Sequence, residues 1–261
     1  NAKKKLFDNL SKESFSIINS DDKRADYITQ NSKSKIIHYS VNSISDNKGR
    51  IIENNLDGML VDIDNEKISL GLIGEFNLYN ILSVYVFSKI LKISKIKSLS
   101  IISKIKPPRG RLEYIKSSNG SIGIVDYAHT PNALENVLTS INKIKGENKI
   151  ISIIGAGGDR DKSKRPEMGR VAEEYSDYVI VTSDNPRNEN EIDIINDIIK
   201  GFKTENYIIE SDRKKAIINA CNNIDNKTIL LIAGKGHEDY QIIGNNYIPH
   251  NDMEILRKEF K

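Results

Sequence analysis

Charged and glycine-rich segments follow four of the apolar runs in the second half of the chain. They read DYAHTP from position 126, GAGGDRD from 155, SDNPRN from 183 and AGKGHEDY from 233. Guanidinium groups bind carboxylates through two parallel hydrogen bonds, and carboxylates bind ammonium groups. Two arginines, two carboxylates and glycine-exposed backbone therefore favour an amino acid ligand with more than one carboxylate.

The segment GAGGDRDKSKRP, positions 155–166, contains glycines and a Lys-Ser pair but lacks the spacing of a phosphate loop. The pattern G-x-x-x-x-G-K-[ST] requires glycine where Ala156 and Asp161 stand. The dinucleotide pattern G-x-G-x-x-G meets Arg160 at its third glycine. We therefore expect this loop to receive something other than a nucleotide phosphate, or nothing.

The segment SDNPRN has two interpretations. Pro186 restricts its own backbone and that of Asn185, which would fix the directions of Asp184 and Arg187 toward a ligand. Equally, the segment is a turn in which Asn188 caps the next helix.

The other loops also have structural alternatives. Arg160 taken alone is more often bound in a salt bridge, here to Asp159 or Asp161. In AGKGHEDY, Gly234 lets the backbone approach a ligand closely, and Glu238 adds a carboxylate. The histidines at 38, 129, 237 and 250 are scattered, so we expect no metal cluster of these side chains.

One feature of the first half could contact a nucleotide. Asn77 and Asn80 stand three residues apart at an expected helix start, where carboxamides can bind the edge of a base, although helix capping explains either one alone. Lys3, in AKKKLF, is explained by spacing only as part of a solvated face.

Regular alternation of strands and helices must position the four loops. Strands are expected at 121–128, 149–154, 178–183, 206–210 and 228–234, with helices at 131–144, 165–176, 190–202 and 212–223. This order predicts a doubly wound, mostly parallel sheet whose loops meet at the carboxyl ends of the strands. Thr130 or Asn132, with Glu135, is typical of a helix start.

Residues 1–106 are expected to be mixed α and β. Helices are predicted at 1–10 and 76–93, and strands at 14–22, 35–41, 58–65 and 67–73. The segment PPRGR at 107–111 breaks the pattern and marks the boundary with a second domain, 107–261.

Composition excludes several classes of protein. The chain has 261 residues, a formal net charge of +3 and one cysteine, Cys221. This balance does not favour nucleic acid, one cysteine excludes an internal disulfide framework, and no apolar run is long enough to span a membrane. Because the chain opens on Asn1 inside an expected helix, we expect it to be part of a longer protein.

Several long motifs resemble those of one family. They are GEFNLYN, GRLEYI, VDYAHTPNALE, GAGGDRDKSKRPEMG, TSDNPRNE, INDI and AGKGHEDYQIIG. In order and spacing they are similar to the Mur ligases, in the branch that adds diaminopimelate, over essentially the whole chain. The resemblance implies residues 1–106 as the carboxyl-terminal part of the central ATPase domain and 107–261 as the amino-acid-binding domain.

The resemblance also implies a reaction. Mur ligases of this branch use ATP and Mg²⁺ to activate the D-Glu γ-carboxylate of UDP-MurNAc-L-Ala-D-Glu as an acyl phosphate, which the amine of meso-diaminopimelate attacks. It implies a monomeric enzyme of peptidoglycan precursor synthesis in the bacterial cytoplasm, serving cell wall biogenesis, cell shape and cell division.

Residue by residue, the family pattern implies three groups of contacts. The diaminopimelate pocket would comprise Arg160, Asp184, Asn185, Pro186, Arg187, Gly234 and Glu238. ATP would contact Asn77, Asn80, Arg111, Asp126 and His129. Lys3 matches the carbamylated lysine that lies near magnesium, with Lys4 as the alternative by register.

The chain also departs from the family. The UDP-sugar domain and the G-K-[ST] phosphate loop are absent from these 261 residues, so we expect the chain alone not to hydrolyse ATP. Two alternatives stay open, a ligase that adds L-lysine and a truncated, non-catalytic amino-acid-binding relic. Arg187 argues against lysine, because a guanidinium facing an ammonium without a partner would cost roughly 2–5 kcal/mol.

Overall fold

The structure, a computed structural model, describes residues 2–260 and contains two compact units. They divide between Lys106 and Pro107, and we call them unit 1 and unit 2. Within the described residues, no helix is both long and apolar enough to cross a bilayer.

Unit 1 is built on a five-stranded sheet in the order β1-β2-β3-β4-β5. Its strands are β1 (Phe15–Asn19), β2 (Lys35–Ser40), β3 (Asn47–Asn55), β4 (Gly58–Ile63) and β5 (Glu66–Leu70). The first three are parallel, and β3, β4 and β5 form an antiparallel meander. The sequence did not indicate β3, because the segment NKGRIIENN is mostly polar.

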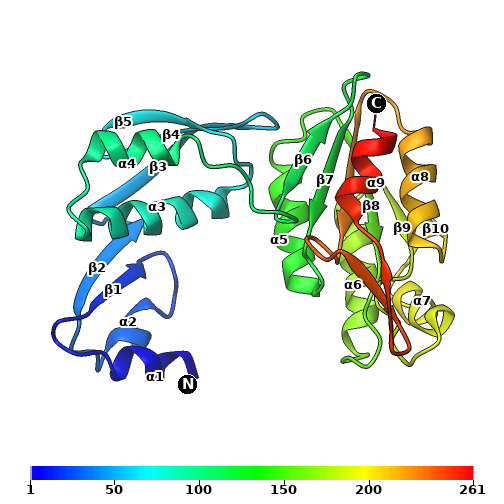
Figure 1. Cartoon of the computed structure of the whole chain (residues 1–261), viewed down its shortest axis with the longest axis horizontal. Helices are drawn as coiled ribbons and strands as arrows, with labels where there is room; N and C mark the ends of the chain where they lie inside the picture. The colour runs from blue at the N-terminus through cyan, green and yellow to red at the C-terminus, as the bar shows by residue number, and fades with distance from the viewer. Residues whose placement is uncertain (1, 261) are drawn as a thin grey trace. The chain divides into compact units, whose positions relative to one another are not determined.

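The helices of unit 1 are α1 (Ala2–Asp8), α2 (Ala25–Thr29), α3 (Glu75–Ile90) and α4 (Lys95–Ile102). Helix α3 lies against β1, β2 and β3 (Figure 1). Its buried face carries the predicted apolar positions 78, 81, 82, 85 and 86, which join the core of the sheet. Residue 1 of the expected first helix lies outside the described residues.

Unit 2 contains the predicted mostly parallel sheet, in the order β10-β9-β8-β11-β7-β6. Its strands are β6 (Glu113–Lys116), β7 (Ile122–Asp126), β8 (Lys149–Ile154), β9 (Tyr178–Val181), β10 (Tyr207–Ile209) and β11 (Thr228–Ala233). Strand β6 alone is antiparallel, at one edge. Strands β7 and β11 are buried throughout, as expected where helices cover both faces of a sheet.

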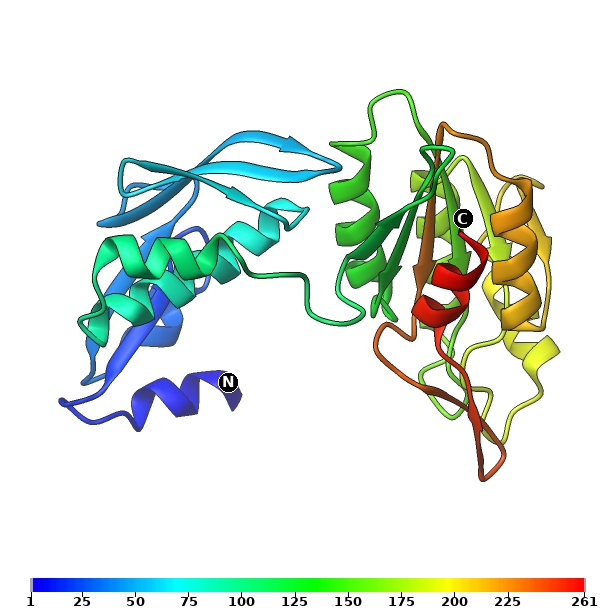
Figure 2. The same cartoon turned by 45° about the horizontal axis from the view of Figure 1, so that its top comes forward.

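Helices cover both faces of this sheet (Figures 1 and 2). One group is α5 (Pro131–Asn142), α6 (Lys164–Tyr175) and α7 (Glu191–Ile199), and the other is α8 (Arg213–Asn223) and α9 (Asp252–Glu259). Thr130 caps α5 by accepting a hydrogen bond from the Ala133 amide, as predicted. Asn190 caps α7, so the interpretation of Asn188 as the cap was wrong by two residues.

A two-stranded hairpin, β12 (Tyr240–Ile243) and β13 (Asn246–Pro249), follows the last parallel strand. Neither the hairpin nor α9 was anticipated, because both are short and lie beyond the regular alternation. The hairpin matters for the site, because its backbone bonds to the segment SDNPRN.

Candidate functional site

The carboxyl ends of β7, β8, β9 and β11 surround one cavity of about 340 Å³ in unit 2. It is lined by Tyr127, His129, Thr130, Ala156, Gly157, Arg160, Asp161, Lys164, Arg165, Met168, Asp184, Asn185, Arg187, Gly234 and Glu238. All four chemistry-bearing loops thus contribute, as the parallel sheet required. Of the seven predicted pocket residues, six line this cavity.

Pro186 is the exception, since it stands outside the lining and works through its backbone. Its carbonyl oxygen would lie 1.9 Å from a Cβ atom placed on Gly158. The loop after β8 and the loop after β9 therefore touch backbone to backbone, and only glycine at 158 permits this.

Arg187 is held by its own backbone and by the hairpin. Its φ of 51° lies in the left-handed region, which is uncommon for a residue other than glycine. Its amide donates to the Ile242 carbonyl at 3.0 Å, and its carbonyl accepts from the Gly244 amide at 2.7 Å. Nη1 donates to the Gly158 carbonyl at 2.7 Å.

Arg160 presents a second guanidinium group to the cavity. Among residues 2–260 it has no ion pair, so the expected salt bridge to Asp159 or Asp161 does not form. Asp161 instead pairs with Lys164, and Asp159 accepts from the side chain of Asn188. Arg160 is therefore available to a ligand.

Asp184 and Glu238 form an acidic wall of the cavity together with the carboxamide of Asn185. Asp184 and Asn185 are buried, and Glu238 is half-buried. Asn185 Nδ2 donates to Glu238 Oε2 at 2.9 Å. This wall can accept hydrogen bonds from an ammonium group.

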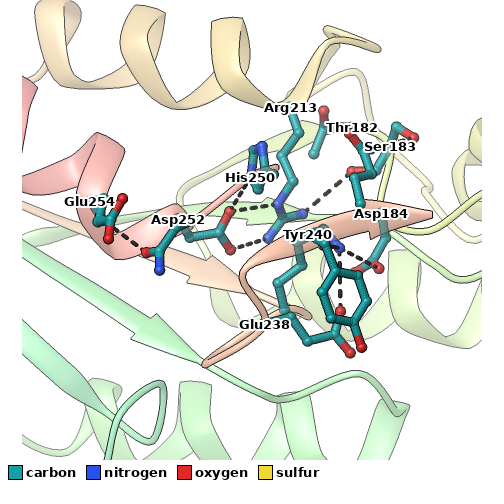
Figure 3. A network of polar contacts seen from close by, with 12 residues as sticks. Thr182, Ser183, Asp184, Arg213, Glu238, Tyr240, His250, Asp252 and Glu254 are labelled. Atoms are coloured by element: carbon teal, nitrogen blue, oxygen red, sulfur yellow. Dashed lines mark hydrogen bonds and ion pairs between the residues drawn. The ribbon is translucent and has the colours of Figure 1, made fainter. Parts of the chain in front are cut away.

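A buried ion pair that sequence reasoning missed lies behind this wall (Figure 3). Arg213 donates to both oxygens of Asp252, at 2.9 and 2.7 Å, and to the carbonyl of Ala233. Burial acts to raise the pKa of Asp252, but Arg213 and then His250 outweigh it and hold that pKa well below its usual range. The pair joins the start of α9 to the end of β11, and no local pattern indicates it.

Arg165 is a second buried cation, and no pattern in the sequence indicates it. It donates to Glu189 at 2.8 and 3.0 Å and to Asp197 at 3.0 Å. Hydrogen bonds from Arg165 and Lys162 lower the pKa of Glu189 to about 2. Since the Asp159 amide also donates to Glu189, this network fixes the loop that carries Arg160.

The predicted nucleotide contacts of unit 2 separate into two roles. Burial raises the pKa of Asp126, whose two oxygens accept the amide protons of Leu112 and Ala128 at 2.8 Å each. Asp126 thus shapes the loop and has its oxygens occupied. Arg111 lies over the Tyr127 ring at 4.9 Å, with His129 at 4.7 Å from the same ring, so these two offer an aromatic and basic surface.

The predicted site residues of unit 1 lie on α1 and α3. Lys3 is exposed on α1, whereas Lys4 is buried and paired with Asp8, which favours Lys3 as the amine free for modification. Asn77 donates to the Ile73 carbonyl, and Asn80 donates to Asn77 Oδ1 at 3.3 Å. Neither caps α3, whose N-cap is Gly74.

A metal ion would need several ligands. Within the part of the chain that the structure describes, no group of three His, Cys, Asp or Glu side chains is arranged to hold one. Lys3 therefore stands as a single candidate ligand.

Known proteins match this architecture. The Mur ligase middle domain matches residues 1–87, and the domain described as "Mur ligase, glutamate ligase domain" matches residues 110–236. The UDP-N-acetylmuramoyl-L-alanyl-D-glutamate–2,6-diaminopimelate ligases of Bacteroides fragilis and Fusobacterium nucleatum are 45% and 42% identical, over 99% of this chain and 54% of each relative. The chain thus spans about half the length of these relatives.

Solved structures agree. A diaminopimelate ligase of the same name is 29% identical with a TM-score of 0.67, covering 99% of this chain and 55% of its own. A folylpolyglutamate synthase from Thermotoga maritima has a TM-score of 0.65 at 18% identity, over 84% of this chain and 50% of its own, and shows the shared fold alone. Both family domains, in this order, together with the predicted motifs, mean that the chain belongs to the Mur ligase family.

Proposed function

We propose that this chain is part of a ligase that joins meso-diaminopimelate to UDP-MurNAc-L-Ala-D-Glu in peptidoglycan precursor synthesis in the cytoplasm. The D-Glu γ-carboxylate would first accept the γ-phosphoryl group of ATP, which gives an acyl phosphate and releases ADP. The neutral amine of diaminopimelate would then attack the acyl carbon, the amide bond would form with loss of one proton from the amine, and phosphate would leave with the electrons of the C–O bond. The names and identities of the relatives support this reaction.

The observation that carries the proposal is the charge arrangement of the cavity in unit 2. Arg160 and Arg187 both line the cavity and would bind the distal carboxylate of diaminopimelate, which L-lysine lacks. Among the described residues, the hydrogen bonds of the Arg187 guanidinium group go to backbone carbonyls, which leave its positive charge without a carboxylate partner. Asp184 and Glu238 offer oxygens to the ammonium group. A ligand with only one carboxylate would leave a guanidinium group without its partner.

ATP and Mg²⁺ belong to the proposal as the cofactors that the family implies. Arg111 and His129 would bind the nucleotide in unit 2, and Asp126 would hold the two segments that carry them, through the amides of Leu112 and Ala128. Asn77 and Asn80 are the candidates in unit 1. Lys3, as its carbamate, would bind near magnesium, supported by its exposure beside the buried Lys4.

Calorimetric titration of the chain with meso-diaminopimelate, and separately with L-lysine, tests the proposal. We expect diaminopimelate to bind and lysine not to bind, with loss of roughly tenfold to a thousandfold in affinity in Arg187→Ala. Arg170→Ala is the matched control, because Arg170 is exposed on α6 and its ion pair within residues 2–260 is with Glu174.

Each other outcome is informative. Lysine binding would overturn the role of Arg187 and favour the lysine-adding ligase. If neither amino acid binds this chain, a longer protein that includes a phosphate loop is tested in the same way. If neither binds that protein either, the result favours a non-catalytic relic.

A further inference from the structure

Lys235 lies behind the acidic wall of the cavity and does not line it. Its side chain is 0% exposed. We propose that Lys235 is a positioning residue, whose ammonium group holds Asn185, Glu238 and Asp184 in the arrangement that receives the amino group of the ligand. The inference rests on the proposed function for the identity of that ligand, but not for the arrangement itself.

The ammonium group has no hydrogen left for a ligand. Nζ donates to Asn185 Oδ1 and to the Tyr240 carbonyl, both at 2.8 Å, and to Glu238 Oε2 at 3.3 Å. An ammonium group has three donors, and all three are used. Lys235 therefore acts on the ligand only through its partners.

Asn185 is oriented through both ends of its carboxamide. Its Oδ1 accepts from Lys235 and from the Ile242 amide, at 2.8 and 2.9 Å, and its Nδ2 donates to Glu238 Oε2 at 2.9 Å. Oε2 of Glu238 is thus committed to the protein. Within residues 2–260 no hydrogen bond reaches Oε1, so that oxygen is left for the cavity, which Glu238 lines.

The ammonium group also balances two negative charges. Asp184 Oδ1 lies 3.7 Å from Nζ, and Glu238 Oε2 lies 3.3 Å away. The next cation inward, Arg213, is engaged by Asp252, which His250 also contacts (Figure 3). Without Lys235, Asp184 and Glu238 would each lose the one ion pair that they form within residues 2–260, and their charges would stay partly buried without it.

The backbone explains why the lysine points inward. Gly234 and Gly236, on either side of it, have φ angles of 119° and 53°. A Cβ atom on Gly236 would lie 2.7 Å from the Gly110 carbonyl oxygen. The sequence Gly-Lys-Gly is therefore a tight turn whose two glycines adopt backbone angles that other residues rarely adopt, and the lysine between them is buried.

The first test needs no ligand. In the wild-type chain we expect the Asn185 carboxamide protons to exchange slowly with solvent, measured by NMR, because both ends of the group are bonded. Lys235→Met, which keeps most of the volume and removes the charge, should speed this exchange at least tenfold. Lys227→Met is the matched control, since Lys227 is 62% exposed and pairs with Glu147 at the surface.

The second test uses meso-diaminopimelate as the ligand. Lys235→Met should lose at least about tenfold in affinity, measured well below its melting temperature, and Lys227→Met should lose none. A purely structural role would lower the melting temperature but leave the affinity of the folded protein unchanged.

The outcomes separate the two proposals. Unchanged Asn185 exchange, or affinity within about twofold of wild type, in Lys235→Met would overturn the role of Lys235. If the wild type binds no amino acid, the proposed function fails while the exchange experiment still decides the arrangement. Should Lys235→Met not fold, Lys235→Met/Glu238→Gln removes one carboxylate together with the ammonium group and so keeps the net charge of the wild type. Fast Asn185 exchange in that variant is the expected result, and slow exchange would overturn the role of Lys235.

Discussion

The two units differ in the number and position of their buried charged side chains. In unit 2 the buried charged residues are Asp126, Arg165, Asp184, Arg213, Lys235 and Asp252, and most of them stand at or just behind the cavity wall. In the described part of unit 1 the corresponding residue is Lys4, while the candidate contacts Asn77 and Asn80 are neutral and bonded to nearby groups of the chain. Burying a charged group is costly unless it is paired. In unit 2 the buried charges are paired in a network that holds the side chains of the site in place before a ligand binds.

The largest expected effect tests whether that network holds unit 2 together. Arg213→Met should lower the free energy of unfolding by roughly 3–5 kcal/mol, because Asp252 would stay buried without its partner. Calorimetric unfolding of the whole chain measures it.

Arg170→Met is the control for that experiment. It breaks an exposed pair on α6 and should cost less than about 0.5 kcal/mol. Equal losses in the two variants would mean that burial does not distinguish these pairs.

The next largest loss of stability is expected where the backbone at Gly158 contacts the backbone at Pro186. Gly158→Ala places a Cβ atom 1.9 Å from the Pro186 carbonyl oxygen and should cost roughly 1–3 kcal/mol. It should also weaken amino acid binding, because the loops that carry Arg160 and Arg187 must separate. Gly71→Ala in unit 1 is the control, since no atom lies within 4 Å of its Cβ position; a comparable loss there would contradict the argument.

Two asparagines sharpen the comparison between the units. Asn185→Ala should destabilise the chain by roughly 1–3 kcal/mol, because it leaves buried Lys235 with a missing acceptor. Asn80→Ala removes a single exposed 3.3 Å contact and should stay within about 0.5 kcal/mol. Urea denaturation of both variants decides the matter, and a cost at Asn80 equal to that at Asn185 would remove the distinction.

The smallest expected effect appears in acid. The folded pKa of Glu189 is about 2, below its ordinary value of 4.5, so its contribution to stability is full above pH 4.5 and is lost as the pH falls toward 2. Glu189→Gln should therefore show a shallower fall of melting temperature between pH 5 and pH 2.5 than the wild type. Parallel curves for the two proteins would show that Glu189 does not titrate with folding.

Most of unit 2 could be predicted because its signals are local. The apolar runs and helical spacing gave five parallel strands and four helices close to their observed bounds, and the family motifs gave the loops. In unit 1, β3 was missed because strand formation there depends on pairing with β4, and its residues are largely polar. The hairpin β12–β13 was missed although it is the element that fastens the backbone of Arg187.

By itself, the sequence determined that four charged loops share one edge of a parallel sheet, because strand direction and crossover hand follow from local periodicity. Only the tertiary structure decided which charged side chains are paired within the protein and which are open to a ligand. Arg213 and Asp252 are 39 positions apart, and Lys235 and Asn185 are 50 apart. Whether a lysine or an aspartate faces a ligand or a buried partner depends on such distant neighbours, which spacing along the chain does not contain.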